Sequence, residues 1–119
     1  MKAIFITQAG GPEVLQLQET EKPSPKENEV LLKIKAAGVN RSDILTRKNP
    51  DAYGDDLPSA KIPGLEVSGV IEATGSQVSN FKIDDKVCAL VAGGGYAEYI
   101  CVDERLCLSI PKGLSFIEA

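Results

Sequence analysis

The sequence predicts a mainly β domain, folded as a small, partly open barrel or sandwich with one or two short helices. Short apolar segments recur along the chain, and several alternate apolar with polar residues as half-buried strands do. Glycine, proline and aspartate separate these segments at intervals of roughly 8–12 residues, which is typical of all-β domains. The length of 119 residues and a hydrophobic fraction of 43% suit one domain with one core.

Three strands are expected in the first third of the chain. Their segments are 1–7, 13–20 and 30–39. The third has the clearest alternation, because Leu32, Ile34 and Ala36 face one side of the predicted strand. Lys33 and Lys35 face the other side. This strand should therefore bury one face and expose the other.

The segment 40–48 predicts a short helix. Asn40 is the expected N-cap, because its side-chain oxygen can accept a hydrogen bond from the first turn. A loop with three prolines follows at 49–63. Loops of this length inside a compact domain are often functional.

Four further strands are expected in the second half of the chain. Their segments are 64–75, 84–92, 96–104 and 105–111. The first is interrupted by Gly69, which indicates either one bent strand or a pair of strands. Three consecutive glycines, Gly93–Gly95, join the second segment to the third.

The last residues predict the beginning of another helix. Ser115 and Glu118 have the spacing of a capping box, with serine at the N-cap and glutamate three residues later. One helical turn is not stable alone, because helix nucleation is unfavourable. We therefore expect the natural polypeptide to continue beyond Ala119, the alternative being a frayed terminus with a chance match to the pattern.

Composition excludes several classes of function. The chain contains no histidine, which excludes a Ser-His-Asp triad, a Cys-His dyad and every metal site that requires imidazole. A net charge of -4 gives no general attraction for nucleic acid. No apolar run approaches the roughly 20 residues that cross a bilayer, and the start lacks the apolar region of a signal peptide. A cytoplasmic protein without a membrane partner is expected.

The cysteines do not indicate a structural framework. Cys88, Cys101 and Cys107 are odd in number, and the chain has no CxxC pair. Neither a disulfide network nor a cysteine zinc site is expected. These residues should be free, buried thiols.

Five segments in order resemble the N-terminal GroES-like catalytic domain of the medium-chain dehydrogenase/reductase superfamily. They are 2–17, 22–47, 62–87, 93–102 and 110–119. Within the superfamily the chain is most similar to the zinc-free quinone oxidoreductases. The resemblance implies a GroES-like, partly open β-barrel over residues 1–119 and an NADPH-binding Rossmann domain after residue 119. It also implies hydride transfer to a quinone or conjugated carbonyl, and a homodimer or higher homo-oligomer of the full-length protein.

The resemblance implies chemistry without a metal. Zinc alcohol dehydrogenases are similar at Ala-Ala-Gly-x-x-Arg-Ser-Asp, with a ligand cysteine where this chain has Asn40. Leu65 stands where they have a ligand histidine, although the surrounding glycine and glutamate frame is kept. Neither side chain binds Zn²⁺ usefully, and the four-cysteine structural lobe is missing.

The resemblance also implies four site residues. Asn40 and Tyr53 would serve in catalysis, Asn40 by lining the nicotinamide and substrate pocket, and Tyr53 by stacking on a quinone ring. Gly93 and Gly94, with Asn40, would border the cofactor, because glycine lets backbone approach a ligand closely. Each has a structural alternative: a plain N-cap for Asn40, a loop anchor for Tyr53 and a tight bulged hairpin for the glycines.

Two more positions carry expectations. Glu66 lies in a run suited to the core, and we expect a structural carboxylate that holds backbone groups or an arginine such as Arg41. Asp84 stands where the family usually has glycine, a departure that costs little if the turn tolerates an aspartate in the left-handed conformation.

Two other functions stay open. An enoyl or alkenal reductase of the same superfamily would share the fold and cofactor, and the loop 49–63 does not decide between the substrates. A non-enzymatic GroES-like binding barrel is the alternative from another class.

Overall fold

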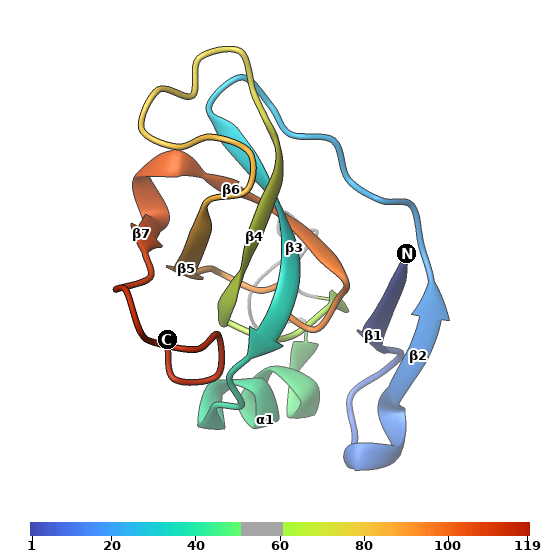
Figure 1. Ribbon diagram of the computed structural model, residues 1–119. Helices are drawn as coiled ribbons and strands as arrows, with labels where there is room; N and C mark the ends of the chain where they lie inside the picture. Colours follow the sequence, from blue (N-terminus) through green and yellow to red (C-terminus); the bar gives the residue numbers. More distant parts are fainter. Residues whose placement is uncertain (51–60) are drawn as a thin grey trace.

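The computed structural model describes residues 1–50 and 61–119, which contain seven strands and one α-helix (Figure 1). The strands form a five-stranded sheet in the order β6-β3-β4-β5-β7 and a two-stranded sheet of β1 and β2. The mainly β fold with one short α-helix is confirmed, as two open sheets and not as a closed barrel. The elements are β1 Lys2–Ile6, η1 Pro12–Val14, β2 Leu15–Glu19, β3 Glu29–Ala37, α1 Arg41–Lys48, β4 Glu66–Thr74, β5 Lys86–Leu90, β6 Tyr99–Asp103, η4 Glu104–Leu106 and β7 Cys107–Ser109, where η marks a 3-10 turn.

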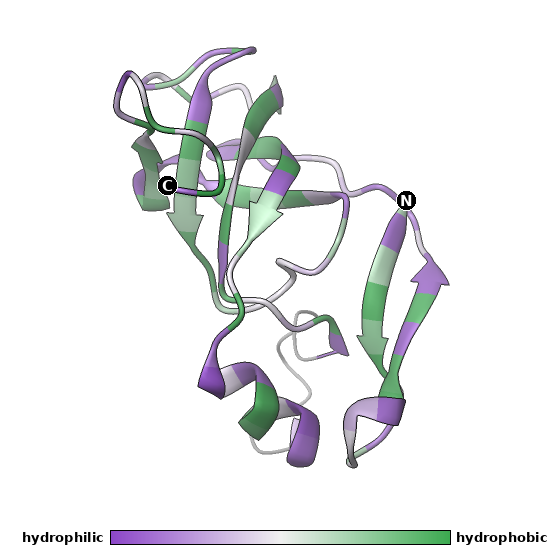
Figure 2. Ribbon diagram, turned by 60° about the horizontal axis from the view of Figure 1, so that its bottom comes forward, coloured by the Kyte–Doolittle hydropathy of each residue, from purple (hydrophilic) through white to green (hydrophobic). Residues whose placement is uncertain are grey.

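The core lies on one face of the five-stranded sheet. Val30 and Leu32 of β3 and Ile71 of β4 are shielded from solvent, whereas Lys33 and Lys35 are exposed, as the alternation predicts. Every strand of the sheet contributes to this core, and Figure 2 shows the alternation as green and purple bands along the strands. The other buried members of the cluster are Val67, Val87, Ala89, Val102 and Cys107.

The central strands are bent by irregular pairing. β3 and β4 are antiparallel, and their register shifts between Leu31 and Leu32 and again between Ile34 and Ala36. An unpaired residue of this kind bends a strand and increases its twist. The segment 64–75 is accordingly one bent strand, β4, and not a pair of strands.

The segment between β5 and β6 connects the two sheets. Ile4 N donates to Tyr96 O at 2.8 Å, Glu98 N donates to Lys2 O at 3.0 Å, and Ala3 pairs with Ala97 in an isolated bridge. β5 pairs with β4 and β7, while β6 pairs with β3. The tight-hairpin alternative for the glycine run is therefore wrong, because the strands on either side of it are not partners.

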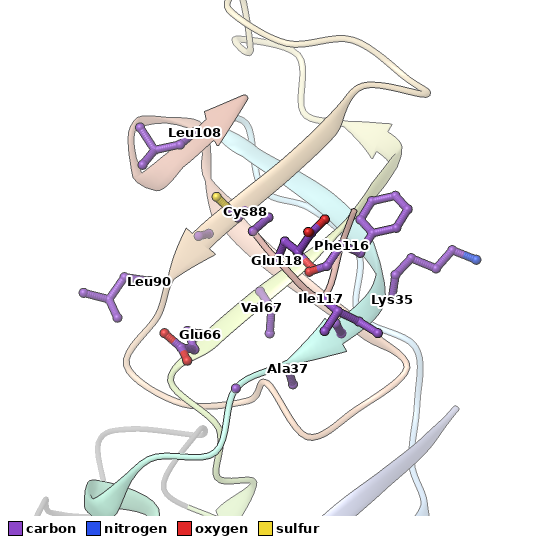
Figure 3. Close-up of a pocket in the computed structure, with 15 residues that line it drawn as sticks. Lys35, Ala37, Glu66, Val67, Cys88, Leu90, Leu108, Phe116, Ile117 and Glu118 are labelled. Atoms are coloured by element: carbon purple, nitrogen blue, oxygen red, sulfur yellow. The ribbon is translucent and has the colours of Figure 1, made fainter. Parts of the chain in front are cut away.

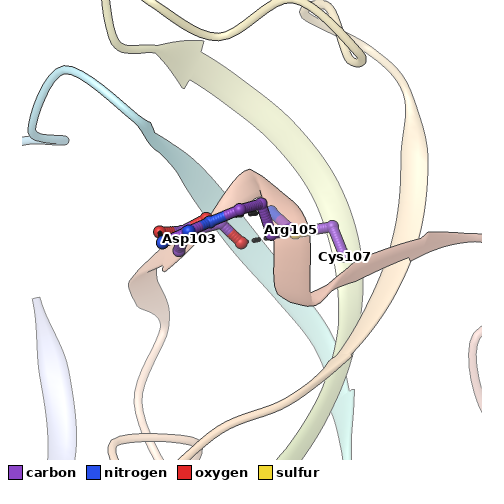
Figure 4. A network of polar contacts seen from close by, with 3 residues as sticks. All are labelled: Asp103, Arg105 and Cys107. Carbon is purple, nitrogen blue, oxygen red and sulfur yellow. Dashed lines mark hydrogen bonds and ion pairs between the residues drawn. The ribbon is translucent and has the colours of Figure 1, made fainter.

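Two carboxylates stabilise the connection from β6 to β7. Asp103 accepts hydrogen bonds from Arg105 N and Nε at 2.9 Å each and from Nη2 at 2.6 Å (Figure 4). The side-chain hydrogen bond from Arg105 lowers the pKa of Asp103 to about 2. The buried Glu104 accepts from the backbone N–H groups of Ser79 and Asn80, at 3.2 and 2.9 Å. Glu104 thereby ties the turn before β5 to η4.

Asp84 has the left-handed conformation. Its φ is 73°, and it is the one non-glycine residue with positive φ in the described part of the chain. Asp84 N donates to Ile71 O at 2.9 Å, which holds the turn against β4. This conformation costs an ordinary L-residue about 1–2 kcal/mol, and aspartate tolerates it better than most.

We predict that Asp84→Gly raises the free energy of unfolding by up to about 1 kcal/mol, because glycine adopts positive φ without steric cost. Asp84→Val should lower it by more than about 1 kcal/mol, since β-branched residues are least compatible with this conformation. Urea unfolding of the three proteins measures both effects. The Asp84 side chain is exposed, so the comparison reports the backbone. Equal free energies of unfolding for Asp84→Gly and Asp84→Val would contradict the prediction.

Candidate functional site

The candidate site lies where β3 leads into α1. β3 ends at Ala37, and Asn40 precedes α1 with an extended backbone, φ −125° and ψ 157°. Asn40 and Asp43 form a capping box, in which Asn40 N donates to Asp43 Oδ2 at 2.8 Å. Asn40 occupies the N-cap position, as predicted, and Asp43 N donates to its backbone O at 3.1 Å.

Asn40 also has an unpaired polar atom. Its Nδ2 is buried and has no hydrogen-bond partner among residues 1–50 and 61–119, and the same is true of Ser42 Oγ. A buried donor without a partner costs about 1–3 kcal/mol. An oxygen of a bound ligand beside Nδ2 would remove this cost, so the start of α1 is suited to hold a polar ligand.

Asp43 joins three separate segments at this point. Besides Asn40 N, its Oδ2 accepts from Tyr96 Oη at 2.7 Å, and its Oδ1 accepts from Gly64 N at 3.1 Å. The three donors lie 3, 21 and 53 residues from Asp43 along the chain. Both carboxylate oxygens are thus used, and the start of α1 is fixed to the segments before β4 and before β6.

Those two segments are also hydrogen-bonded to each other. Gly95 N donates to Gly64 O and Tyr96 N donates to Pro63 O, at 2.9 Å each, and Gly94 N donates to Ile62 O at 2.7 Å. Gly64 has φ 99°, and a Cβ there would lie 2.6 Å from Tyr96 Cδ1. Glycine is required at this position both by its backbone conformation and by the contact with Tyr96.

The environment of Tyr96 keeps its phenol protonated. Burial raises the pKa of Tyr96 well above its ordinary value, and the hydrogen bond to the Asp43 carboxylate raises it further. A protonated phenol is the form that can donate to a carboxylate. Tyr96 is therefore a permanent donor to Asp43 at neutral pH.

The four predicted site residues do not all meet in the described part of the structure. Tyr53 lies outside the described residues. Gly93 and Gly94, with φ of 155° and 90°, line an apolar cavity of about 440 Å³, together with Val91 and Ile100. Asn40 does not line this cavity. Gly94 is nevertheless linked to the Asn40 region, through its hydrogen bond to the segment that holds Gly64.

A second cavity, of about 660 Å³, lies between the sheet and the C-terminal turn. Figure 3 shows its lining, which comes from β3, β4, β5, β7 and the last four residues. Ser68 Oγ donates to Phe116 O at 2.6 Å and holds the turn on the sheet. The predicted capping box forms here, with Ser115 N to Glu118 Oε2 at 2.9 Å and Glu118 N to Ser115 Oγ at 3.3 Å.

The expectation for Glu66 is wrong. Glu66 is exposed and lines the larger cavity, at the first position of β4 (Figure 3). Within the described residues its carboxylate makes no hydrogen bond and no ion pair with Arg41. The first residue of a strand at the open end of a sheet is hydrated, and a carboxylate there needs no protein partner.

Sequence reasoning missed Asp43, Gly64 and Tyr96. Asp43 had a local signal, because it follows Asn40 by three residues as the acidic member of a capping box does. Gly64 and Tyr96 had none, since their contacts depend on how distant segments lie side by side.

The model of the alcohol dehydrogenase GroES-like domain family matches residues 26–112. The chain belongs to this family. The quinone oxidoreductase of Lama guanicoe is 42% identical to this GroES-like domain over 118 residues, which are 98% of the chain and 35% of that relative. The domain therefore spans about a third of the length of that relative, and its recognised likeness to quinone oxidoreductases is confirmed.

Solved structures agree with the assignment. The Escherichia coli quinone oxidoreductase, determined in complex with NADPH, matches with a TM-score of 0.87 and 32% identity, over 98% of this domain and 35% of that chain. The CurK enoyl reductase matches with a TM-score of 0.86 and 26% identity, over 97% of this domain and 36% of that chain. The same fold thus occurs in reductases with different names.

The cysteines of the domain form no disulfide. The three cysteines are free, as expected, and burial raises the pKa of Cys101 and of Cys107 to about 11, which keeps these thiols protonated.

Among the described residues no three His, Cys, Asp or Glu side chains gather as a metal site would require. No helix in the described ranges is long and apolar enough to span a bilayer.

We predict that Tyr96 ionises at a higher pH than a free phenol. Subtracting the titration of Tyr96→Phe from that of the wild type, by absorbance near 295 nm, isolates this residue from the other two tyrosines. Because the pKa is raised on folding, the stabilisation is complete below the unfolded value of about 10 and is lost as pH rises through the folded value. Tyr96→Phe should therefore be less stable than the wild type at pH 7, by about 1.5–3 kcal/mol for one hydrogen bond to a charged group. Ionisation of Tyr96 near pH 10 would contradict the partly buried hydrogen bond from its hydroxyl to Asp43.

Proposed function

We propose that this chain is the substrate-binding domain of an NADPH-dependent oxidoreductase that reduces quinones by hydride transfer without a metal. The Rossmann domain would lie after residue 119, in a polypeptide of the size of the relatives, of which this domain spans 35%. The observation that carries the proposal is the buried Nδ2 of Asn40, which has no hydrogen-bond partner among the described residues and lies at the start of α1 in a domain whose relatives are named quinone oxidoreductases.

Asn40 has the chemistry that quinone reduction requires of a protein side chain. When a quinone accepts a hydride, negative charge develops on its oxygen, and a fixed donor stabilises that charge. Asn40 Nδ2 is such a donor, and its backbone N–H is already bound by Asp43, so the residue has a defined position. Tyr53, as the resemblance implies, would stack on the quinone ring.

The described residues are compatible with a nicotinamide cofactor. NADPH supplies the hydride when it is bound. Asn40 offers a free donor to an oxygen of the cofactor or substrate, and Gly93 and Gly94 present backbone without a side chain along a cavity wall. These residues would hold the ring while the Rossmann domain binds the phosphates.

A metal is not needed for this substrate class. A quinone is already a good electrophile and does not require polarisation by a Lewis acid, as a simple ketone does. Asn40 and Leu65, at the two positions where zinc relatives have ligands, support the same conclusion, because an amide and an alkyl group are poor ligands for Zn²⁺.

A second candidate is the reduction of a conjugated double bond. The likeness to the CurK enoyl reductase favours it, with 26% identity over 97% of this chain. An α,β-unsaturated carbonyl would also develop negative charge on an oxygen that Asn40 could stabilise. The two candidates differ in substrate and not in the role of Asn40.

We predict that residues 1–119 alone do not oxidise NADPH in the presence of 1,4-benzoquinone, because the Rossmann domain would supply most of the cofactor contacts. The absorbance of NADPH at 340 nm measures the rate. Turnover by the purified domain above the uncatalysed rate would contradict the proposal that catalysis requires the Rossmann domain.

A domain graft tests the function itself. Residues 1–119 would replace the aligned third of the Escherichia coli quinone oxidoreductase. We expect NADPH-dependent reduction of 1,4-benzoquinone that is insensitive to 1,10-phenanthroline. Asn40→Ala should lower kcat/KM by about 100- to 1,000-fold, as loss of one fixed donor to a developing oxyanion does. Asn28→Ala, at an exposed asparagine before β3, is the matched control and should have no effect.

The outcomes separate the candidates. Higher kcat/KM with a 2-alkenal than with the quinone would favour the enoyl reductase. A folded graft that binds NADPH, measured by its fluorescence, and reduces neither compound would refute both candidates.

A further inference from the structure

We propose that Asp43 is the positioning residue of this site: its carboxylate sets where the Asn40 side chain lies by joining the start of α1 to the segments that hold Gly64 and Tyr96. The inference rests on the proposed function to the extent that Asn40 contacts the ligand. It adds a residue that does not itself touch the ligand and acts through Asn40.

Both oxygens of the Asp43 carboxylate accept hydrogen bonds. Oδ2 accepts from Asn40 N at 2.8 Å and from Tyr96 Oη at 2.7 Å, and Oδ1 accepts from Gly64 N at 3.1 Å. Asp43 forms no salt bridge with a described lysine or arginine. Its charge is balanced by these three donors and by its place in the first turn of α1, where the helix dipole favours an anion.

The three donors to Asp43 belong to segments that border the candidate site. Asn40 N is the backbone of the residue with the unpaired Nδ2. Gly64 directly precedes Leu65 and β4, and Tyr96 follows the glycine run that borders the smaller cavity. One carboxylate therefore joins the segment of Asn40 to the segments of Gly64 and Tyr96.

Within the described residues, no other acceptor replaces the Asp43 carboxylate for two of its three donors. Neither Asn40 N nor Gly64 N has another acceptor in the described part of the chain, and Tyr96 Oη has only a longer contact of 3.4 Å to Gly38 O. Asn at position 43 would keep the shape, but its NH₂ group would face a donor. The isosteric change Asp43→Asn should then release at least one of the three segments.

Amide hydrogen exchange tests the positioning directly in the 119-residue chain. We expect Asp43→Asn to increase exchange at the Asn40 and Gly64 amides at least tenfold and to shift the Asn40 side-chain NH₂ resonances. Asp85→Asn is the matched control, because Asp85 Oδ2 also accepts a backbone N–H, from Lys82 at 2.9 Å, in a turn remote from the site. It should leave these signals unchanged.

Two results would overturn the proposal. Unchanged protection and unchanged side-chain resonances of Asn40 in Asp43→Asn would show that the carboxylate does not position it. An equal loss of protection across β3 and β4, with Ile71 as the reference amide, would show that Asp43 stabilises the fold in general and has no particular relation to Asn40.

A double-mutant cycle in the grafted enzyme separates positioning from other roles. If Asp43 acts through Asn40, Asp43→Asn should lower kcat/KM about tenfold with Asn40 present and less than twofold in the Asn40→Ala background. Equal effects in both backgrounds would overturn the proposal. An inactive graft would contradict the proposed function but not the role of Asp43. The exchange experiment requires no activity and decides that role by itself.

Discussion

The antiparallel pairing of β3 with β4 is the constraint on which the candidate site depends. The pair extends to Ala37 opposite Val67, and Gly38 N donates to Glu66 O at 3.1 Å. The chain therefore leaves β3 beside the residues that enter β4. Because α1 begins three residues later, Asp43 comes within hydrogen-bond distance of Gly64 N. The apolar contacts of Leu32 and Ile71 that stabilise the sheet also place the polar groups at its end.

The path of the chain after β5 completes the arrangement. β5 pairs with β4 and β7, so the chain must leave this side of the sheet to reach β6 beside β3. On the way the segment 94–96 lies along 62–64 through three backbone hydrogen bonds, and it brings Tyr96 to Asp43. The glycines of this segment fit a close backbone contact between distant parts of the chain, which a tight hairpin would not require.

Carboxylates occupy contrasting environments in this domain. Glu104 and Asp43 accept hydrogen bonds from backbone N–H groups of distant segments, and each thereby joins parts of the chain that no strand pairing connects. Glu66 has a hydrated position at the end of a strand and joins nothing in the described structure. Glu104 is buried, and a carboxylate removed from water is stable only if donors replace the water.

The sequence by itself determined the features that depend on neighbouring residues. Alternation in 30–39 predicted which face of β3 is buried, Asn40 and Ser115 were recognised as caps, and the turn at Asp84 was linked to the left-handed conformation. Backbone sterics, side-chain period and capping act over a few residues, so a short stretch of sequence contains them. The five ordered segments likewise sufficed to recognise the family.

Only the tertiary structure decided the strand order, the path of the glycine run, the exposure of Glu66 and the contacts of Asp43 with Gly64 and Tyr96. The contacts of Asp43 join residues that lie 21 and 53 positions away along the chain. No local pattern specifies such a partner, because it depends on the burial and pairing of the whole sheet.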